Sequence, residues 1–292
     1  WRAPGALKCK DTNIMKKIIL ILSVLICSIP SIAGPKDQPA GVTVMSYNIR
    51  NSESKDGTNS WQYRYPATGL MVDDIKPDIL CLQEAMPDQL GYLNQAFTIY
   101  DHIGVGEEDG KKKGESTSIF FKSKSFSVSK WGTFWLSETP DKPSECWESG
   151  ETNSVTWAIM KDKKSGHRFI VVNAQLCAEN SEAQKASVAL IVSRIAEINK
   201  ESLPVVLAGD FRMEAGASEL AGIRGAMKDA RGTAAASDSK NSHNGWGKKN
   251  ETVDHIWYNG FSSCVDFSTI DKPYYERNFI SSHFPVQARL IF

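Results

Sequence analysis

The chain has 292 residues, with 34 basic and 34 acidic side chains and hence a formal net charge of zero. Apolar residues make up 41% of it and charged residues 23%, which is ordinary globular composition and excludes a disordered tail, a collagen-like fibre and a polybasic nucleic-acid coat. The length is ample for one large domain with a full hydrophobic core.

The first 34 residues have the pattern of upstream sequence followed by a secretory signal peptide. The basic pair Lys16–Lys17 precedes the apolar run 18–29, and small residues follow this run as far as Gly34. The run is too short to span a bilayer comfortably. We therefore expect cleavage near Gly34, export to the periplasm or the extracellular space, and one domain over residues 35–292. The alternative is an uncleaved anchor.

The domain that remains after cleavage is mildly acidic. Removing residues 1–34 subtracts five basic residues and one acidic residue from the 34 of each kind, which leaves 29 against 33 and a net charge of about −4. Long nucleic acids are held by many Lys and Arg contacts, so we expect no such partner and no membrane contact. One small phosphorylated ligand and a monomeric state are compatible with this charge.

Four cysteines follow the signal region, namely Cys81, Cys146, Cys177 and Cys264. No two of them form a CxxC pair, which excludes a zinc ribbon. One or two disulfides are expected in an exported protein, with the pairing open. Cys81 lies in the apolar run 79–82 and is expected to be a buried core thiol.

Strand-like and helix-like segments alternate along the domain. Strands are expected over residues 42–48, 78–83, 118–122, 126–130, 154–161, 167–175, 205–208, 252–258 and 287–292, and helices over 61–75, 87–97 and 179–199. The segments 118–122 and 126–130 are expected to form a hairpin, and a turn at 163–166 joins the next two strands. The pattern favours one α/β domain with mostly antiparallel layers around a core.

Five polar side chains stand where strands end or begin, namely Asn48, Glu84, Asp210, Asp254 and His283. Mg²⁺ prefers carboxylate and amide oxygens, which Glu84 and Asn48 supply. Asp210 can orient a water for in-line attack, and a histidine held by Asp254 can contact a phosphoryl oxygen. Each residue alone is usually a turn or cap residue, but that explanation is weak for all five together. The other histidines (102, 167, 243 and 255) show no ligand spacing and are expected on the surface or in the core.

The strings that carry these residues also resemble a known family. Residues 46–50 (SYNIR), 82–84 (LQE), 209–211 (GDF), 253–256 (VDHI) and 282–286 (SHFPV) occur in the order and spacing of the endonuclease/exonuclease/phosphatase family. The resemblance covers about residues 40–292 and is closest to secreted bacterial members near the deadenylase-like branch. It implies a DNase I-like four-layered α/β sandwich, with two packed, mostly antiparallel sheets flanked by helices.

The resemblance also implies roles for single residues in a Mg²⁺- or Mn²⁺-dependent phosphoesterase site. Asn48 and Glu84 would be on the metal side, Asp210 would be the general base or water-orienting residue, and Asp254 would partner His283 at the scissile phosphate. Glu115 resembles a glutamate that buttresses a second family histidine. Trp246 lies near the site by resemblance and would stack on a base or sugar, with ordinary packing as the alternative.

Three positions depart from the family pattern. Gln175 stands where the family has its first histidine, Arg212 where it has an asparagine and Ser282 where it has an aspartate. Losing one acid-base group typically costs about 10²–10⁴ in rate. Gln175 and Arg212 are still expected to contact the substrate, and Arg212 can clamp a phosphate. The expected function is therefore an exported, metal-dependent phosphoesterase-like hydrolase of a phosphodiester or phosphomonoester, with weakened activity. The alternatives are an inactive member that binds a phosphorylated ligand or a protein, and a scaffold without a ligand.

Overall fold

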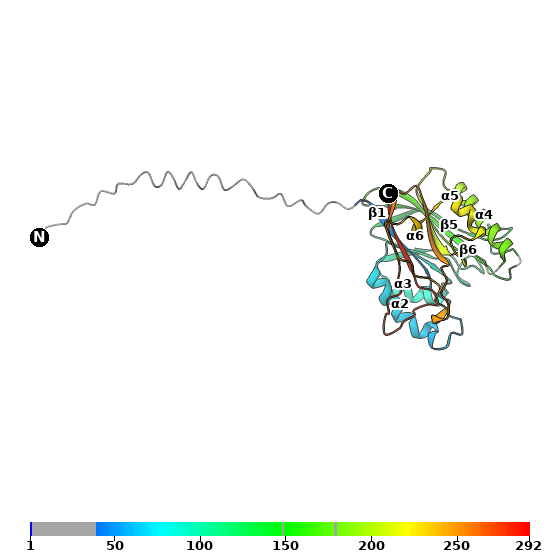
Figure 1. Cartoon of the computed structure of the whole chain (residues 1–292), viewed down its shortest axis with the longest axis horizontal. Coiled ribbons are helices and arrows are strands. Elements are labelled where there is room, and N and C mark those ends of the chain that lie inside the picture. Colours follow the sequence, from blue (N-terminus) through cyan, green and yellow to red (C-terminus); the bar gives the residue numbers. More distant parts are fainter. Residues whose placement is uncertain (2–38, 148, 178–179) are drawn as a thin grey trace. The chain divides into compact units, whose positions relative to one another are not determined.

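Two stacked β-sheets form the centre of the computed structural model, which describes residues 1, 39–147, 149–177 and 180–292 (Figure 1). In spatial order the first sheet contains β10 (Ala236–Ser237), β12 (Ser263–Thr269), β13 (Val286–Ile291), β1 (Gly41–Asn48), β2 (Ile79–Gln83), β4 (Ile119–Lys122) and β3 (Tyr100–Ile103). The second sheet contains β5 (Phe126–Trp135), β6 (Ser154–Asp162), β7 (Arg168–Gln175), β8 (Val205–Asp210), β11 (Asp254–Asn259) and β9 (Lys228–Asp229). The predicted signal peptide and the domain boundary at residue 35 lie outside the described residues.

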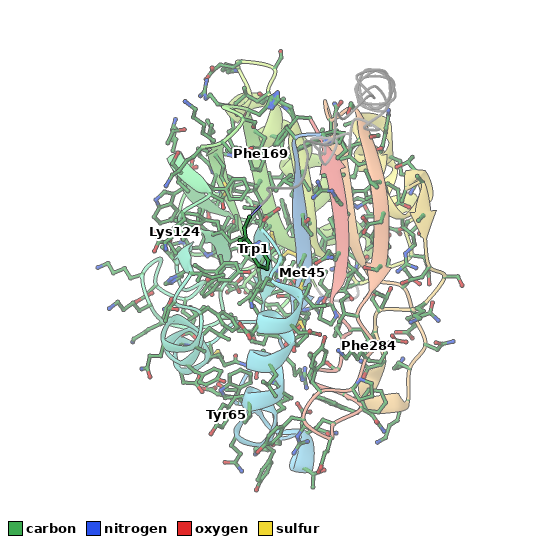
Figure 2. All side chains as sticks on the ribbon, turned by 90° about the vertical axis from the view of Figure 1, so that its left-hand side faces the viewer. Trp1, Met45, Tyr65, Lys124, Phe169 and Phe284 are labelled. Atoms are coloured by element: carbon green, nitrogen blue, oxygen red, sulfur yellow. A yellow bond between two sulfur atoms is a disulfide. The ribbon has the colours of Figure 1, made fainter. Side chains whose placement is uncertain are left out.

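Helices cover the outer face of each sheet. The first sheet packs against α2 (Trp61–Ile75) and α3 (Pro87–Ala96), and the second against α4 (Ser181–Ile198) and α5 (Ala221–Ala226). A shorter helix, α6 (Ala230–Thr233), lies beside β11 and β12. Tyr65 of α2 points away from the sheets (Figure 2). The predicted four-layered sandwich is confirmed.

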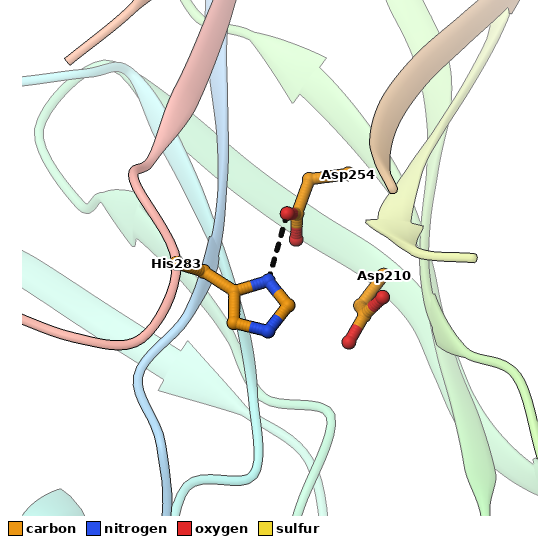
Figure 3. A group of neighbouring side chains, drawn as sticks. All are labelled: Asp210, Asp254 and His283. Carbon is orange, nitrogen blue, oxygen red and sulfur yellow. Dashed lines mark hydrogen bonds and ion pairs between the residues drawn. The ribbon is translucent and has the colours of Figure 1, made fainter. Parts of the chain in front are cut away.

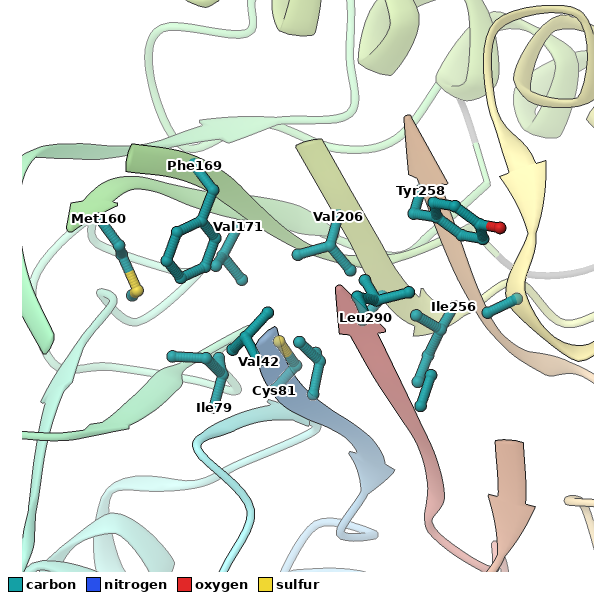
Figure 4. Packing of buried hydrophobic residues seen from close by; sticks show 14 of the residues in the cluster. Val42, Ile79, Cys81, Met160, Phe169, Val171, Val206, Ile256, Tyr258 and Leu290 are labelled. Carbon is teal, nitrogen blue, oxygen red and sulfur yellow. The ribbon is translucent and has the colours of Figure 1, made fainter. Parts of the chain in front are cut away.

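The core between the sheets follows from the alternation of side chains along each strand. Val42 and Val44 of β1 point into the space between the sheets, where they meet Val171 and Val206 of the second sheet (Figure 4). The intervening Met45 packs under the helices of the first sheet instead. Because β1 is buried on both faces, apolar residues occur on both of them.

The predicted strands and helices are found within about five residues of the expected bounds. The sequence missed the strands β3, β9, β10 and β12 and the helices α5 and α6. Among the described strands, eight of the eleven pairings are antiparallel, as the resemblance implied. The turn at 163–166 joins β6 to β7 as predicted. None of the helices among the described residues combines the length and the apolarity that a bilayer crossing requires.

The predicted hairpin at residues 118–130 is wrong. The strand β4 pairs with β2 and β3 in the first sheet, whereas β5 pairs with β6 in the second. Phe121 and Phe126, which flank the connection, both lie in the core between the sheets. Both rings are buried when the chain crosses from the first sheet to the second between β4 and β5, which favours this crossing over a local hairpin.

Cys146 and Cys177 form a disulfide, and among the described residues Cys81 and Cys264 are free and buried. Burial raises the pKa of the Cys81 thiol well above its usual range. The prediction of a core thiol at position 81 is confirmed.

Candidate active site

Three strands end at one edge of the stacked sheets, and each end carries a polar side chain. Asn48 is the last residue of β1, Asp210 is the last residue of β8, and Glu84 directly follows β2. The Asn48 amide nitrogen donates to Glu84 Oε1 at 2.8 Å and to Asp210 Oδ2 at 3.0 Å. One buried amide therefore joins a carboxylate of the first sheet to a carboxylate of the second.

The orientation of the Asn48 amide follows from its oxygen, which accepts from the Arg50 backbone N–H at 2.9 Å. The nitrogen therefore faces the two carboxylates. These contacts make Asn48 a bridge between Glu84 and Asp210. The role of its oxygen as a metal ligand stays a prediction.

The backbone at this edge adopts a conformation that most residues avoid. Arg50, Glu84 and Arg212, which follow the ends of β1, β2 and β8, have φ angles of 60°, 58° and 57°. The left-handed region costs residues other than glycine about 1–2 kcal/mol each, so it persists only where other contacts hold it. Such residues cluster at functional sites, and three of them mark this edge as one.

His283 and Asp254 form a buried pair beside Asp210. His283 Nδ1 lies 2.8 Å from Asp254 Oδ2, and the ring stands across from Asp210 (Figure 3). Burial lowers the pKa of His283, but the nearby negative charges of Asp254, Asp210 and Glu84 together outweigh burial and raise that pKa to about 9. The imidazole is therefore positively charged at neutral pH and donates its Nδ1 proton to Asp254.

Glu84, Asp210 and His283 line a cavity of about 600 Å³. Its acidic walls are formed by Glu84, Glu107, Glu108, Glu115, Glu151, Asp210 and Glu251, and its basic walls by Arg50, Arg212, His243, Lys249 and His283. A cavity of this size is large enough for a small molecule. Charges of both signs suit a ligand that joins a cation to an anion, such as a metal ion with a phosphate.

A model of the endonuclease/exonuclease/phosphatase family matches residues 45–275. The chain belongs to this family. A family protein from Bacteroides thetaiotaomicron is 30% identical to it, with a TM-score of 0.81 over 87% of this chain and 99% of that one. The mannosyl-6-phosphatase of the same organism is also 30% identical, with a TM-score of 0.81 over 86% of this chain and 100% of that one.

More distant relatives share the fold alone. The human Nocturnin catalytic domain, solved with a bound sulfate anion, is 17% identical, with a TM-score of 0.69 over 87% of this chain and 94% of that one. A search among curated proteins finds no match.

The residues present at this edge fit a divalent cation. Glu84 and Asp210 are carboxylates on a largely buried surface, and one carboxylate oxygen of Asp254 lies within 4.8 Å of one of Asp210. Two buried oxygens at this edge, Gln175 Oε1 and Asp254 Oδ1, have no hydrogen-bond partner among the residues that the structure describes. A buried polar atom in that state calls for a water or an ion.

Gln175 occupies the position of the first family histidine and lies behind the cavity rather than in its wall. Its side chain is 1% exposed, and its amide nitrogen donates to Glu84 Oε1 at 3.1 Å. An amide holds a carboxylate in place but transfers no proton. Its predicted contact with substrate stays a prediction, and the contact seen is with Glu84.

Arg212 and Ser282 differ in where they act. The Arg212 guanidinium lines the cavity and pairs with Glu151, with Nη2 at 3.2 Å from Oε2. The Ser282 carbonyl accepts from the backbone N–H groups of Asn244 and Gly245 at 2.9 and 3.0 Å. Arg212 is therefore positioned to meet a ligand, whereas Ser282 anchors a neighbouring loop.

The contact that Glu115 makes is with Asn51 and not with a histidine: Asn51 Nδ2 donates to Glu115 Oε1 at 2.5 Å. Burial and the charge of Glu84 raise the pKa of Glu115 to about 7. Its neighbour Glu107 is more deeply buried, and burial together with Glu115 raises the pKa of Glu107 to about 8. This wall of the cavity thus holds carboxyl groups that exchange protons near neutral pH.

Trp246 lies in a short turn (Gly245–Gly247) beside the site but outside the set of residues that lines the cavity. The Arg64 guanidinium stands 5.8 Å from the centre of its ring. The contact seen is a cation–π contact. Stacking of Trp246 on a base or sugar stays a prediction.

His243 was missed by the sequence analysis. Its ring is stacked on His283 with centroids 4.5 Å apart, its Nδ1 lies 2.8 Å from Glu251 Oε2, and it lines the cavity. A signal for it exists, because a glycine-rich turn at 245–247 separates His243 from Glu251 and favours a reversal that pairs them.

Proposed function

We propose that this protein is a metal-dependent phosphoester hydrolase that acts on a small phosphorylated molecule. The observation that carries the proposal is the bridge of Asn48 between Glu84 and Asp210, with the charged His283–Asp254 pair across from it. One cavity therefore offers carboxylates that can bind a cation, a base that can accept a proton from water, and a hydrogen-bond donor for a phosphoryl oxygen.

A Mg²⁺ or Mn²⁺ ion held by Glu84 would neutralise phosphate charge and polarise the ester. Asp210 accepts the proton of the attacking water, since its carboxylate is oriented by Asn48 and by the Arg212 backbone N–H. The His283 ring donates from Nε2 to a phosphoryl oxygen while Asp254 holds Nδ1. The Arg212 guanidinium reaches the same cavity and clamps the phosphate.

The first candidate substrate is a phosphomonoester of a sugar, because the mannosyl-6-phosphatase of Bacteroides thetaiotaomicron is 30% identical over nearly the whole domain. We also propose export, on the pattern of the N-terminal region, and a monomeric state. The net charge of about −4 supports a small substrate over a long nucleic acid.

The second candidate is a member that binds a phosphorylated ligand without hydrolysing it. One observation favours it: Gln175, at the position of a family histidine, carries no transferable proton. A binder needs only the basic groups of the cavity, which are all present.

The test is hydrolysis of mannose 6-phosphate, 4-nitrophenyl phosphate and bis(4-nitrophenyl) phosphate with Mg²⁺ or Mn²⁺. We expect Glu84→Gln to lower kcat/KM by about 10²-fold or more, and EDTA to abolish turnover until metal is restored. The matched control is Glu108→Gln, an exposed glutamate of the same cavity. Turnover that survives Glu84→Gln contradicts the proposed site. Phosphate binding without turnover selects the second candidate.

A further inference from the structure

A second histidine–carboxylate pair stands beside the His283–Asp254 pair. In both pairs Nδ1 lies 2.8 Å from a carboxylate oxygen, of Glu251 for His243 and of Asp254 for His283. The two imidazole rings are stacked with an interplanar angle of 25°. Because each Nδ1 is engaged, each ring offers Nε2 as the nitrogen that can meet a ligand.

The backbone holds His243 in this place. His243 bridges both Glu251 and His283 in antiparallel fashion, with His243 N donating to Glu251 O at 2.9 Å. Phe284 N donates to Ser242 O at 2.7 Å on the other side of the bridge. The loop before β11 is therefore tied to the segment that carries His283, and the stack does not depend on side-chain packing alone.

His243 is more accessible to a ligand than its neighbour. Its side chain is 25% exposed, against 9% for that of His283, and both line the same cavity. His283 is thus placed to hold the buried side of a phosphate, and His243 lies nearer the mouth. We place the leaving alcohol on this more exposed side of the cavity, near His243.

Ester cleavage also needs a proton for the leaving oxygen, and none of the catalytic roles assigned so far includes that proton transfer. Asp210 takes a proton from water, while His283 stays bonded to Asp254 and supports the phosphoryl oxygens. Gln175 has no acidic proton to give. An alkoxide leaves slowly unless a general acid protonates it, and histidine is the side chain suited to this at neutral pH.

We propose that His243, positioned by Glu251, is the general acid that protonates the leaving oxygen, on the hydrolysis proposed above. The bond from water oxygen to phosphorus forms and the bond from phosphorus to the ester oxygen breaks. Asp210 receives the water proton, and His243 Nε2 gives its proton to the ester oxygen, which departs as an alcohol. The neutral ring regains a proton from solvent through the mouth.

The test compares esters whose leaving groups differ in basicity. We expect His243→Gln to lower kcat/KM by about 10²–10⁴-fold for an alkyl ester such as mannose 6-phosphate. The loss is expected to be less than about tenfold for 4-nitrophenyl phosphate, since nitrophenolate leaves without a proton. Glu251→Gln is expected to show the same dependence with smaller losses. The control is His167→Gln, which is exposed and precedes β7, at the other end of that strand from Gln175.

Equal losses for all esters, or no loss for the alkyl ester, would overturn the proposal. If His243→Gln unfolds, His243→Ala in the presence of added imidazole replaces it, and recovery confined to the alkyl ester supports the assignment. If the wild-type protein shows no turnover that depends on Glu84, the proposed function fails by itself. Inorganic phosphate is then titrated while the imidazole nitrogen signals are followed by NMR. A shift of the His243 Nε2 signal supports its contact with phosphate, and an unchanged signal refutes it.

Discussion

Glu107→Gln tests whether folding raises the pKa of a carboxyl group in the cavity wall and thereby lowers the stability of the protein at neutral pH. Glu107 is buried, and its Oε1 accepts from both the backbone N–H and the hydroxyl of Ser154. Burial, then the charge of Glu115, raises the pKa of Glu107 from 4.5 to about 8 in the folded protein. When folding raises the pKa of a group, the free energy of unfolding is highest below the unfolded pKa and falls as the pH rises from there through the folded pKa.

The magnitude follows from these two pKa values. A carboxyl group that titrates at 4.5 unfolded and at about 8 folded lowers the free energy of unfolding by about 3 kcal/mol at pH 7. Glutamine keeps the oxygen that Ser154 contacts and removes the charge. We therefore expect Glu107→Gln to match the wild type near pH 4.5 and to be more stable by about 3 kcal/mol at pH 7, which is roughly 6–12 °C in Tm for a domain of this size.

The measurement is urea and thermal unfolding of EDTA-treated protein from pH 4.5 to 8.5. Glu108→Gln is the matched control, because it makes the same substitution at a neighbouring glutamate that is exposed. The reasoning is refuted if the stability difference between Glu107→Gln and the wild type stays constant over this range. A constant difference would mean that packing, and not ionisation, accounts for the effect.

Two further predictions concern the loop that carries Glu151. Arg212→Ala is expected to raise KM for phosphomonoesters roughly tenfold to a hundredfold, since a charged hydrogen bond contributes about 1.5–3 kcal/mol. Glu151→Gln is expected to lower KM, because it releases Arg212 from its ion pair. A rise of KM in both variants would mean that the ion pair has only a structural role. Cys146→Ala is expected to lower the free energy of unfolding by about 3–4 kcal/mol, because the Cys146–Cys177 disulfide closes a loop with a sequence separation of 31. Dithiothreitol should then lower the Tm of the wild type and leave that of the variant unchanged.

The sequence predicted those parts of the fold in which local pattern and burial agree. The helix expected over 61–75 is found as Trp61–Ile75, because its apolar spacing is helical and Pro77 prevents its extension. The hairpin at 118–130 failed because alternation shows which side of a strand is buried but not which sheet the strand joins. Ser263–Thr269 was missed because only three of its seven residues are buried, which leaves a weak pattern.

The same distinction separates the site residues that were predicted from His243, which was missed and has only the glycine-rich turn at 245–247 as a signal. Asn48, Glu84 and Asp210 stand at the ends of apolar strands, so their convergence follows once the strands are stacked. His243 lies in a loop with little apolar pattern, and its position depends on backbone bonds to distant residues. Contacts of this kind leave no periodic signal in the chain.

The substituted positions of the family pattern therefore do not decide by themselves whether this site is active. Replacing a histidine by Gln175 removes a proton carrier from the end of β7 but keeps Glu84 in place through a hydrogen bond. His243 brings an imidazole to the same cavity from a different element and stacks it on His283. A cavity needs a transferable proton near the leaving oxygen, whichever strand or loop supplies it. Activity should accordingly be more sensitive to His243→Gln than to Gln175→Ala for alkyl esters, and the reverse order would place the catalytic contribution back on β7.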